Sequence, residues 1–77
     1  MSSLRLTDLN PGDCARVVGY LEESDYSHQL MRLGLIPGTQ FEVKRFAPLG
    51  DPIEIRFRGF SLTLRPGEAR CLSLEKL

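Results

Sequence analysis

The sequence predicts a mainly β fold, a small barrel of five short strands with one inserted helix. The clearest signal is alternation: Ile53, Ile55 and Phe57 alternate with charged residues, which is typical of a strand with one buried face. Clusters of Gly, Pro, Asn and Asp separate this run from four other strand-like runs. With 77 residues there is room for one domain and one small core. A sheet this small avoids exposed edges by closing on itself, so we expect residues 1–77 to form a single barrel domain.

The helix is expected at about residues 24–33, between a first strand at residues 14–20 and a second at residues 39–46. Ser24 or Asp25 can cap its N-terminus, because short polar side chains accept hydrogen bonds from the free backbone N–H groups there. The helix therefore interrupts the strands early in the chain.

One face of this helix is apolar, because Tyr26, Leu30 and Leu33 recur at the spacing of helical turns. Gly34 follows, where a left-handed residue commonly ends a helix. In such a Schellman motif Leu35 would pack back on Leu30.

The later strands are expected at residues 53–58, 62–65 and 72–77. Their short links predict an antiparallel meander, and the turn at residues 66–69 lies where an SH3-like barrel has a 3₁₀ turn. An OB-fold also has five strands, but its helix normally lies between the third and fourth. The helix position here therefore favours the SH3-like barrel.

The charge balance limits the kinds of partner. Ten Lys and Arg residues face ten Asp and Glu residues, so the formal net charge is zero. This argues against a nucleic-acid-binding barrel or an electrostatic membrane anchor, both of which need a basic surface. No apolar run approaches the roughly 20 residues that span a bilayer, and residues 1–5 lack the apolar core of a signal peptide. We therefore expect a cytoplasmic protein.

The sequence offers no set of residues for catalysis or for a metal. His28 is the single histidine, and Cys14 and Cys71 lie near opposite ends of the chain, so ligand spacing does not support a transition metal such as ferrous iron. We expect both cysteines to be reduced, partly buried thiols. Neither a nucleophile with its base nor a phosphate-binding loop is evident. The sequence therefore predicts no enzyme, no cofactor site and no metal site.

Arg45, Arg56, Arg58 and Arg65 form a basic set on the expected strands. An arginine can assist a GTPase by neutralising charge in its transition state. The simpler interpretation is a solvated face on which these arginines pair with Glu42 and Glu54 across strands.

The segment Ala-Pro-Leu-Gly-Asp-Pro at residues 47–52 is an unusual loop. Two prolines restrict its backbone, and Leu49 places an apolar side chain where loops are normally polar. Leu49 would either contact a partner or close an open end of the barrel.

Three segments resemble the ferrous iron transport protein A family (FeoA). They are Leu-Gly-Leu-Ile-Pro-Gly at residues 33–38, Ala-Pro-Leu-Gly-Asp-Pro-Ile at 47–53, and Leu-Arg at 64–65 with Glu-Ala at 68–69. The resemblance covers residues from about Asp13 to the C-terminus. It implies a small, cytosolic SH3-like protein that accompanies the membrane GTPase permease for ferrous iron. A related module ends the iron-dependent repressors, but no helix-turn-helix pattern precedes it here.

The resulting hypothesis is a non-catalytic accessory or regulatory protein that binds the cytoplasmic side of the ferrous iron permease. Two alternatives remain: a metal-responsive module that binds a transition metal or dimerises, and a nucleic-acid-binding barrel. Weak self-association also stays open. The expected partner surface combines the proline-rich loop with the turn after the helix, because each carries an apolar residue in a surface turn. Its residues are Leu35, Ile36, Pro37, Gly38, Pro48, Leu49, Gly50, Asp51 and Pro52.

Overall fold

The computed structural model describes residues 4–49, 51–65, 67 and 69–77. The chain forms five strands and one α-helix, with two short 3₁₀ helices. In order along the chain these are η1 (Leu6–Asp8), β1 (Cys14–Tyr20), α1 (Asp25–Arg32), β2 (Gln40–Phe46), β3 (Ile53–Phe57), β4 (Phe60–Leu64), η2 (Ala69–Cys71) and β5 (Leu72–Lys76). The predicted mainly β fold, with a helix between the first two strands, is confirmed.

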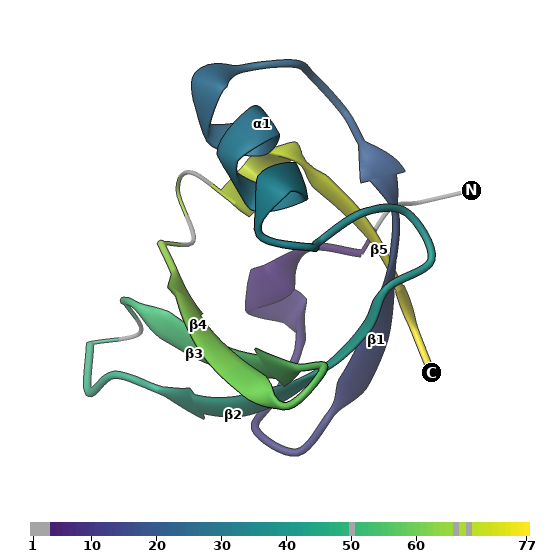
Figure 1. Ribbon diagram of the computed structural model, residues 1–77. Helices are drawn as coiled ribbons and strands as arrows, with labels where there is room; N and C mark the ends of the chain where they lie inside the picture. The colour runs from purple at the N-terminus through teal and green to yellow at the C-terminus, as the bar shows by residue number, and fades with distance from the viewer. Residues whose placement is uncertain (1–3, 50, 66, 68) are drawn as a thin grey trace.

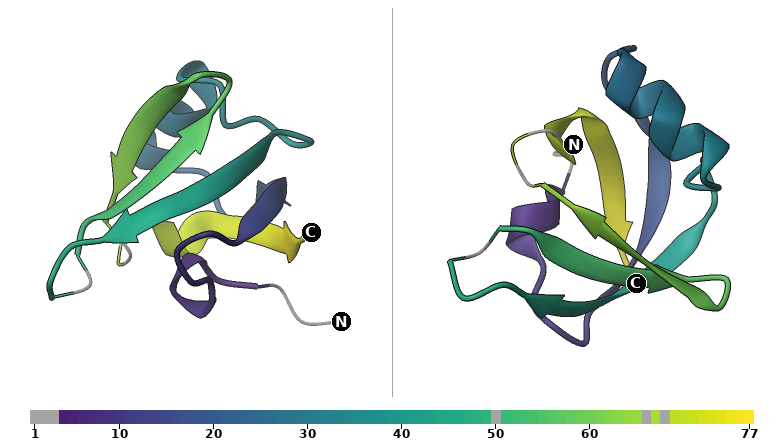
Figure 2. Two further views of the ribbon diagram at one scale, coloured as in Figure 1. Left: turned by 90° about the horizontal axis from the view of Figure 1, so that it is seen from below. Right: turned by 60° about the vertical axis from the view of Figure 1, so that its left-hand side comes forward.

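The strands form one strongly curved antiparallel sheet in the order β4-β3-β2-β1-β5 (Figure 1). The sheet bends so that β1 and β5 face the three remaining strands across the core (Figure 2). Within the described part of the chain, β4 and β5 are not hydrogen-bonded to each other. The curvature therefore encloses a core without pairing the two edge strands.

The predicted meander of the last three strands is wrong. β4 follows β3 in a hairpin, but β5 pairs with β1, with Val17 opposite Leu74. The link between β4 and β5 is short, but the two strands do not pair. The chain turns between them through η2, and Ala69 N donates to Arg65 O at 2.9 Å. This turn carries β5 to the opposite edge, where Leu72 and Leu74 join the core. A 3₁₀ turn is present at Ala69–Cys71, later in the chain than the expected residues 66–69, of which 66 and 68 lie outside the described residues.

The β3–β4 hairpin pairs antiparallel with the predicted buried face, but β4 begins at Phe60 and not at Leu62 as expected. Ile53 lies opposite Leu64, and Phe57 lies opposite Phe60. The side chains of Ile55, Phe57 and Leu64 are buried in one hydrophobic core, as the alternation predicted. Opposite residues of an antiparallel pair point to the same face, so the pattern of β3 also orients β4.

Helix α1 begins and ends as predicted. Ser24 Oγ accepts a hydrogen bond from Ser27 N at 3.1 Å, and Ser27 Oγ accepts one from Ser24 N at 2.9 Å. At the other end Gly34 has φ of +112°, and Leu35 N donates to Leu30 O at 3.1 Å, which completes the Schellman motif. None of the helices in the described residues is long and apolar enough to cross a membrane.

The N-terminal segment contributes to the core, although the sequence predicts no helix or strand there. Leu6 and Leu9, at the start of and just after η1, are buried. Leu4 forms an isolated antiparallel bridge with Leu74 on the outer edge of β5. The segment before the first strand therefore closes one side of the sheet.

Candidate partner-binding surface

The loop between β2 and β3 is held to the core at its base. Phe46 lies opposite Ile53 in the last pair of the two strands, and Ile53 is fully buried. Ala47 N donates a hydrogen bond to Pro52 O at 3.0 Å, which joins the two ends of the loop. The tip therefore projects from a fixed base, at the lower left of Figure 1.

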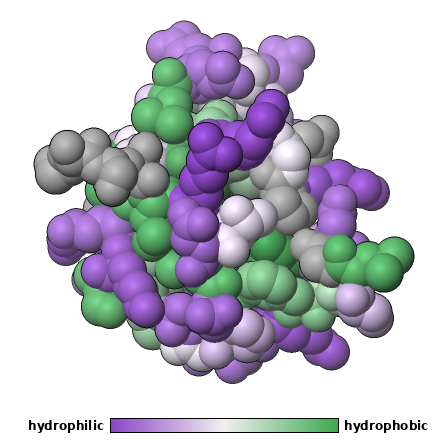
Figure 3. Space-filling model, turned by 180° about the vertical axis from the view of Figure 1, so that it is seen from behind, coloured by the Kyte–Doolittle hydropathy of each residue, from purple (hydrophilic) through white to green (hydrophobic). Residues whose placement is uncertain are grey.

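Leu49 lies at this tip with 96% of its surface exposed. The interpretation that it closes an open end of the barrel is therefore wrong. Pro48, Asp51 and Pro52 are also exposed, whereas Gly50 lies outside the described residues. In the view from behind, a hydrophobic group stands out at the right-hand edge, on the side of this loop (Figure 3). The loop thus presents an apolar side chain to solvent.

An ion pair lies beside the base of the loop. Arg45 Nε donates to Glu54 Oε1 at 2.7 Å, and this hydrogen bond holds the pKa of the Glu54 carboxyl below its usual value. The predicted pairing across strands is confirmed for this pair. Arg56, Arg58 and Arg65 are exposed and form no ion pair with any described residue.

The turn after α1 is fixed by backbone hydrogen bonds. Gly38 N donates to Val17 O at 2.7 Å, and Thr39 N donates to Ile36 O at 3.0 Å. Thr39 Oγ1 donates to Gly34 O at 3.0 Å. Pro37 and Gly38 are exposed, and Ile36 keeps 43% of its surface exposed.

Leu35 does not belong to the exposed surface, contrary to the expectation. Its side chain is fully buried, because the Schellman motif turns it back onto the core beside Leu30. Its carbonyl accepts a hydrogen bond from Tyr20 Oη at 2.6 Å. A tyrosine hydroxyl is protonated at neutral pH and can donate this bond, and burial raises the pKa of Tyr20 further, to about 12. Leu35 therefore has a structural role.

The structure does not bring the two predicted segments together. The turn after α1 leads into one end of β2, and the β2–β3 loop leaves its other end (Figure 1). A strand of seven residues spans roughly 20 Å or more. The predicted single surface is therefore two separate sites.

Two half-exposed apolar residues near the end of α1 were missed. Leu33 was placed on the core face of the helix, but it is 44% exposed, and Phe60 is 52% exposed. The Phe60 ring packs against Phe57 with centroids 5.1 Å apart, and a Cβ on Gly34 would lie 3.3 Å from Phe57 Cε2. Only the hairpin register places Phe60 on the face that meets the helix end, so sequence alone gave little signal for it.

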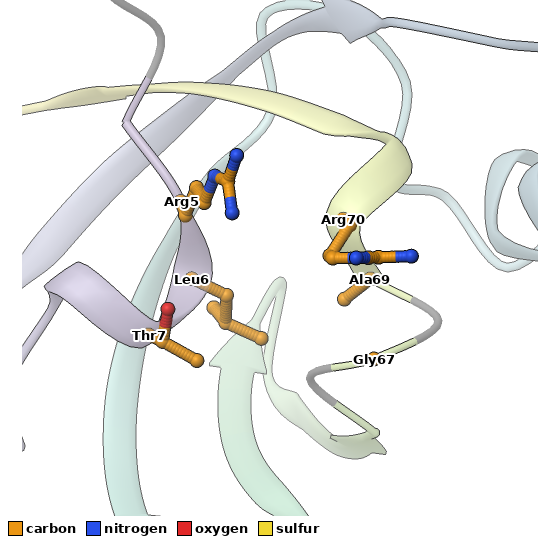
Figure 4. Close-up of a pocket in the computed structure, with 6 residues that line it drawn as sticks. All are labelled: Arg5, Leu6, Thr7, Gly67, Ala69 and Arg70. Carbon is orange, nitrogen blue, oxygen red and sulfur yellow. The ribbon is translucent and has the colours of Figure 1, made fainter.

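A small pocket of about 230 Å³ lies between η1 and η2 (Figure 4). Leu6 and Ala69 point toward one another across it, whereas the guanidinium of Arg70 points away. Its lining is completed by Arg5, Thr7 and Gly67. Among the described residues that line the pocket, no nucleophile is paired with a base for acid–base or covalent chemistry.

The two cysteines are free and differ in exposure. Cys14 is exposed, contrary to the expectation of a partly buried thiol, whereas Cys71 is buried. Burial raises the pKa of the Cys71 thiol. Among the described residues, no three His, Cys, Asp or Glu side chains are grouped as for a metal ion.

The family model of the FeoA domain matches residues 4–76. The chain belongs to the FeoA family. The match includes the N-terminal segment that the sequence resemblance left out, in agreement with the burial of Leu6 and Leu9. The family is involved in ferrous iron transport.

Solved structures of FeoA proteins share the fold. An FeoA-like protein from Clostridium acetobutylicum is 35% identical, with a TM-score of 0.87 over 100% of this chain and 91% of that one. An FeoA protein of Stenotrophomonas maltophilia, described as an SH3 domain protein complexed with zinc, is 19% identical, with a TM-score of 0.81 over 95% of this chain and 91% of that one. The fold is therefore SH3-like, as predicted.

A curated relative joins the FeoA domain to a transporter. The Fe(2+) transport protein A/Fe(2+) transporter FeoB fusion protein of Porphyromonas gingivalis is 28% identical over 72 residues, which are 94% of this chain. The match spans only 8% of that protein's length. An FeoA domain and an FeoB transporter thus occur in one polypeptide in that relative.

Proposed function

We propose that this protein is a non-catalytic accessory protein of ferrous iron uptake. It acts in the cytoplasm as one SH3-like module and binds the GTPase-bearing part of the ferrous iron permease. Membership of the FeoA family and the fused relative support this function. The observation that carries the binding role is Leu49, which is 96% exposed on a loop with a fixed base.

The geometry of the loop is favourable for binding. Exposing a leucine to water is unfavourable, and a partner that covers it gains roughly 1.5–3 kcal/mol. Pro48 and Pro52 restrict the backbone on both sides of the tip. A segment that is already ordered loses less entropy on binding, so more of the contact energy remains as affinity. Leu49 is thus suited to be an anchor residue in a pocket of the partner.

The turn after α1 is the second contact site in this proposal. Ile36, Pro37 and Gly38 are exposed there, and the turn is also held by hydrogen bonds to β1. Because this site and the loop lie at opposite ends of β2, a partner that contacts both must extend along the sheet or use two separate segments.

The Leu49→Asp variant tests the proposal. We expect an unchanged melting temperature, since the side chain has no packing to lose, and a fall of about tenfold or more in affinity for the purified GTPase-bearing part of the permease. The matched control is Leu21→Asp, which makes the same change at a leucine that is 62% exposed after β1. Calorimetry with and without guanine nucleotide measures the affinity. Equal affinities of the two variants and the wild type would exclude the loop as the contact site.

The Ile36→Asp variant measures the contribution of the second site. We expect weaker binding, with a modest fall in melting temperature because Ile36 is partly buried, and losses of affinity that add in the Leu49→Asp, Ile36→Asp double variant because the two sites are far apart. A double variant no weaker than Leu49→Asp alone would remove the turn from the contact surface.

A further inference from the structure

Strand β4 has an open outer edge in the described part of the molecule. The strands β1, β2 and β3 each pair on both sides, and at the outer edge of β5 Leu74 O accepts a hydrogen bond from Leu4 N at 3.4 Å. β4 pairs only with β3. Seen from below, β4 lies at the margin of the molecule (Figure 2, left). The edge of β5 is thus bridged at one residue, whereas no described residue bridges the outer edge of β4.

The hairpin turn determines which groups point out of this edge. Arg58 and Gly59 have φ of +52° and +87° and form a two-residue turn closed by Phe57 and Phe60. In such a turn the N–H of Phe60 is directed at β3. Because the direction alternates along a strand, the N–H and C=O groups of Ser61 and Thr63 point outward. Both residues are exposed, and neither makes a backbone hydrogen bond outside the β3–β4 ladder to any described residue.

Nothing within β4 protects this edge. Residues 60–64 contain no charge and no proline, and their register with β3 runs without a bulge from Ile53–Leu64 to Phe57–Phe60. Natural edge strands are usually blunted by such features, because unpaired backbone groups are a template for another strand. An unprotected edge of five residues is therefore a suitable site for strand addition.

The charges at both ends of β4 indicate the occupant. Arg58 precedes the strand and Arg65 follows it, and both are exposed and without an ion pair in the described residues. Pairing two β4 strands antiparallel about Leu62 would bring Arg58 of one copy next to Arg65 of the other. In this register Arg65 lies opposite Gly59, one residue from Arg58, and two exposed like charges this close together repel each other. Carboxylates at the ends of an added strand would instead pair with both arginines.

We propose that the outer edge of β4 docks an extended segment of a partner protein with acidic residues at its ends. The segment adds to the sheet beside β4, through main-chain hydrogen bonds to Ser61 and Thr63 and ion pairs to Arg58 and Arg65. The inference rests on the proposed function, because the partner is taken to be the GTPase-bearing part of the permease. It goes beyond that function by assigning a third contact and its chemistry.

The experiment removes one outward donor without changing the β3 ladder. Proline is tolerated in an edge strand where its missing N–H faces solvent, so Thr63→Pro removes a donor that only an added strand would use. Thr63→Val is the matched control, since it keeps the N–H. We expect Thr63→Pro to lower the affinity for the purified GTPase-bearing part of the permease by about tenfold, and Thr63→Val by less than about twofold. Thermal denaturation checks the fold of both.

A second pair of variants tests the charges independently of the backbone. Arg65→Glu is expected to weaken binding, with a loss that shrinks as salt is raised. The control is Arg56→Glu, which makes the same charge change at an exposed residue of β3 and should bind like the wild type. This pair decides the question if Thr63→Pro does not fold.

The outcomes separate this inference from the proposed function. If Leu49→Asp loses binding while Thr63→Pro and Arg65→Glu bind like the wild type, the proposed function stands and the edge inference is wrong. If the wild type does not bind the GTPase-bearing part, both are wrong. If sedimentation shows a wild-type dimer that Thr63→Pro dissociates, the edge is occupied by a second copy and not by an acidic segment.

Discussion

Leu35 and Leu49 show how residues of one type reach opposite environments. Each leucine lies beside a glycine and within two residues of a proline, yet Leu35 is fully buried and Leu49 is 96% exposed. The difference arises from the backbone. The left-handed Gly34 turns Leu35 back onto the core, whereas the hydrogen bond between Ala47 and Pro52 leaves Leu49 at a tip. At this scale composition identifies candidate residues, and backbone geometry decides their environment.

The core position of Phe57 predicts a large effect of truncation. Phe57→Ala should destabilise the protein by about 3–5 kcal/mol, because a buried aromatic ring leaves a cavity. Phe60→Ala, at a ring that is 52% exposed, should cost much less. Urea denaturation of the two variants makes the comparison. Equal losses, or an unchanged midpoint for Phe57→Ala, would contradict the register of the hairpin.

Tyr20 predicts a loss of stability at high pH. Burial raises the folded-state pKa of Tyr20 to about 12, above the ordinary value of about 10. Between these values the unfolded chain releases the phenolic proton while the folded chain keeps it, so stability falls as pH rises from about 10 to 12. Below pH 10 this contribution is fully present.

The variant Tyr20→Phe isolates this effect. It also removes the hydrogen bond to Leu35 O, so it should be less stable by about 1 kcal/mol at neutral pH and lose less stability than the wild type from pH 10 upward. Denaturation midpoints measured at several pH values test both parts. Parallel curves for the variant and the wild type above pH 10 would show that another group causes the alkaline loss.

At the scale of elements, the end of α1 is the best example of a prediction from sequence. The glycine, the leucine after it and the proline that follows specify a Schellman motif by local chemistry, and the structure has it. The pairing of β5 could not be predicted in the same way. Its alternation fits either edge of the sheet, and the choice depends on η2 and on contacts between residues distant in sequence.

Gly34 and Gly38, near the C-terminal end of α1, distinguish two ways in which an added side chain lowers stability: backbone strain and steric contact. Gly34 and Gly38 both have positive φ, of +112° and +96°, but only at Gly34 would a Cβ meet a neighbour, Phe57 Cε2 at 3.3 Å. Both Gly34→Val and Gly38→Val should lose roughly 1–2 kcal/mol from the backbone conformation, and Gly34→Val should lose more. Thermal denaturation compares them, and a Gly34→Val variant as stable as the wild type would contradict the helix end.

For the whole molecule, the strands and helix were predictable because each has its own periodicity. The N-terminal segment was not, since Leu4, Leu6 and Leu9 follow neither a helical nor a strand pattern over so short a stretch. The candidate site was predicted only in part. The tip at Leu49 was found from chemistry, but the separation of the two segments and the open edge of β4 depend on topology.

The burial of Leu9 makes the N-terminal segment part of the hydrophobic core. Leu9 is 1% exposed, so Leu9→Ala should lose about 2–5 kcal/mol of stability. The control Leu21→Ala changes an exposed leucine and should be close to neutral. Chemical denaturation measures the stability of both variants. An unchanged stability of Leu9→Ala would mean that the residues before β1 do not contribute to the core.

The position of β5 determines how the protein is oriented when it is attached to a surface through its C-terminus. The C-terminal end of β5 and the β2–β3 loop lie on opposite sides of the molecule in Figure 1 and in the left view of Figure 2, and Leu77 N donates a hydrogen bond to Cys14 O at 3.0 Å. A tether joined to this end therefore pulls on the sheet directly, and it orients the Leu49 tip away from the anchoring point. Immobilised on a sensor surface through its C-terminus, the protein would present its apolar tip to the solution, ready for capture of a second molecule.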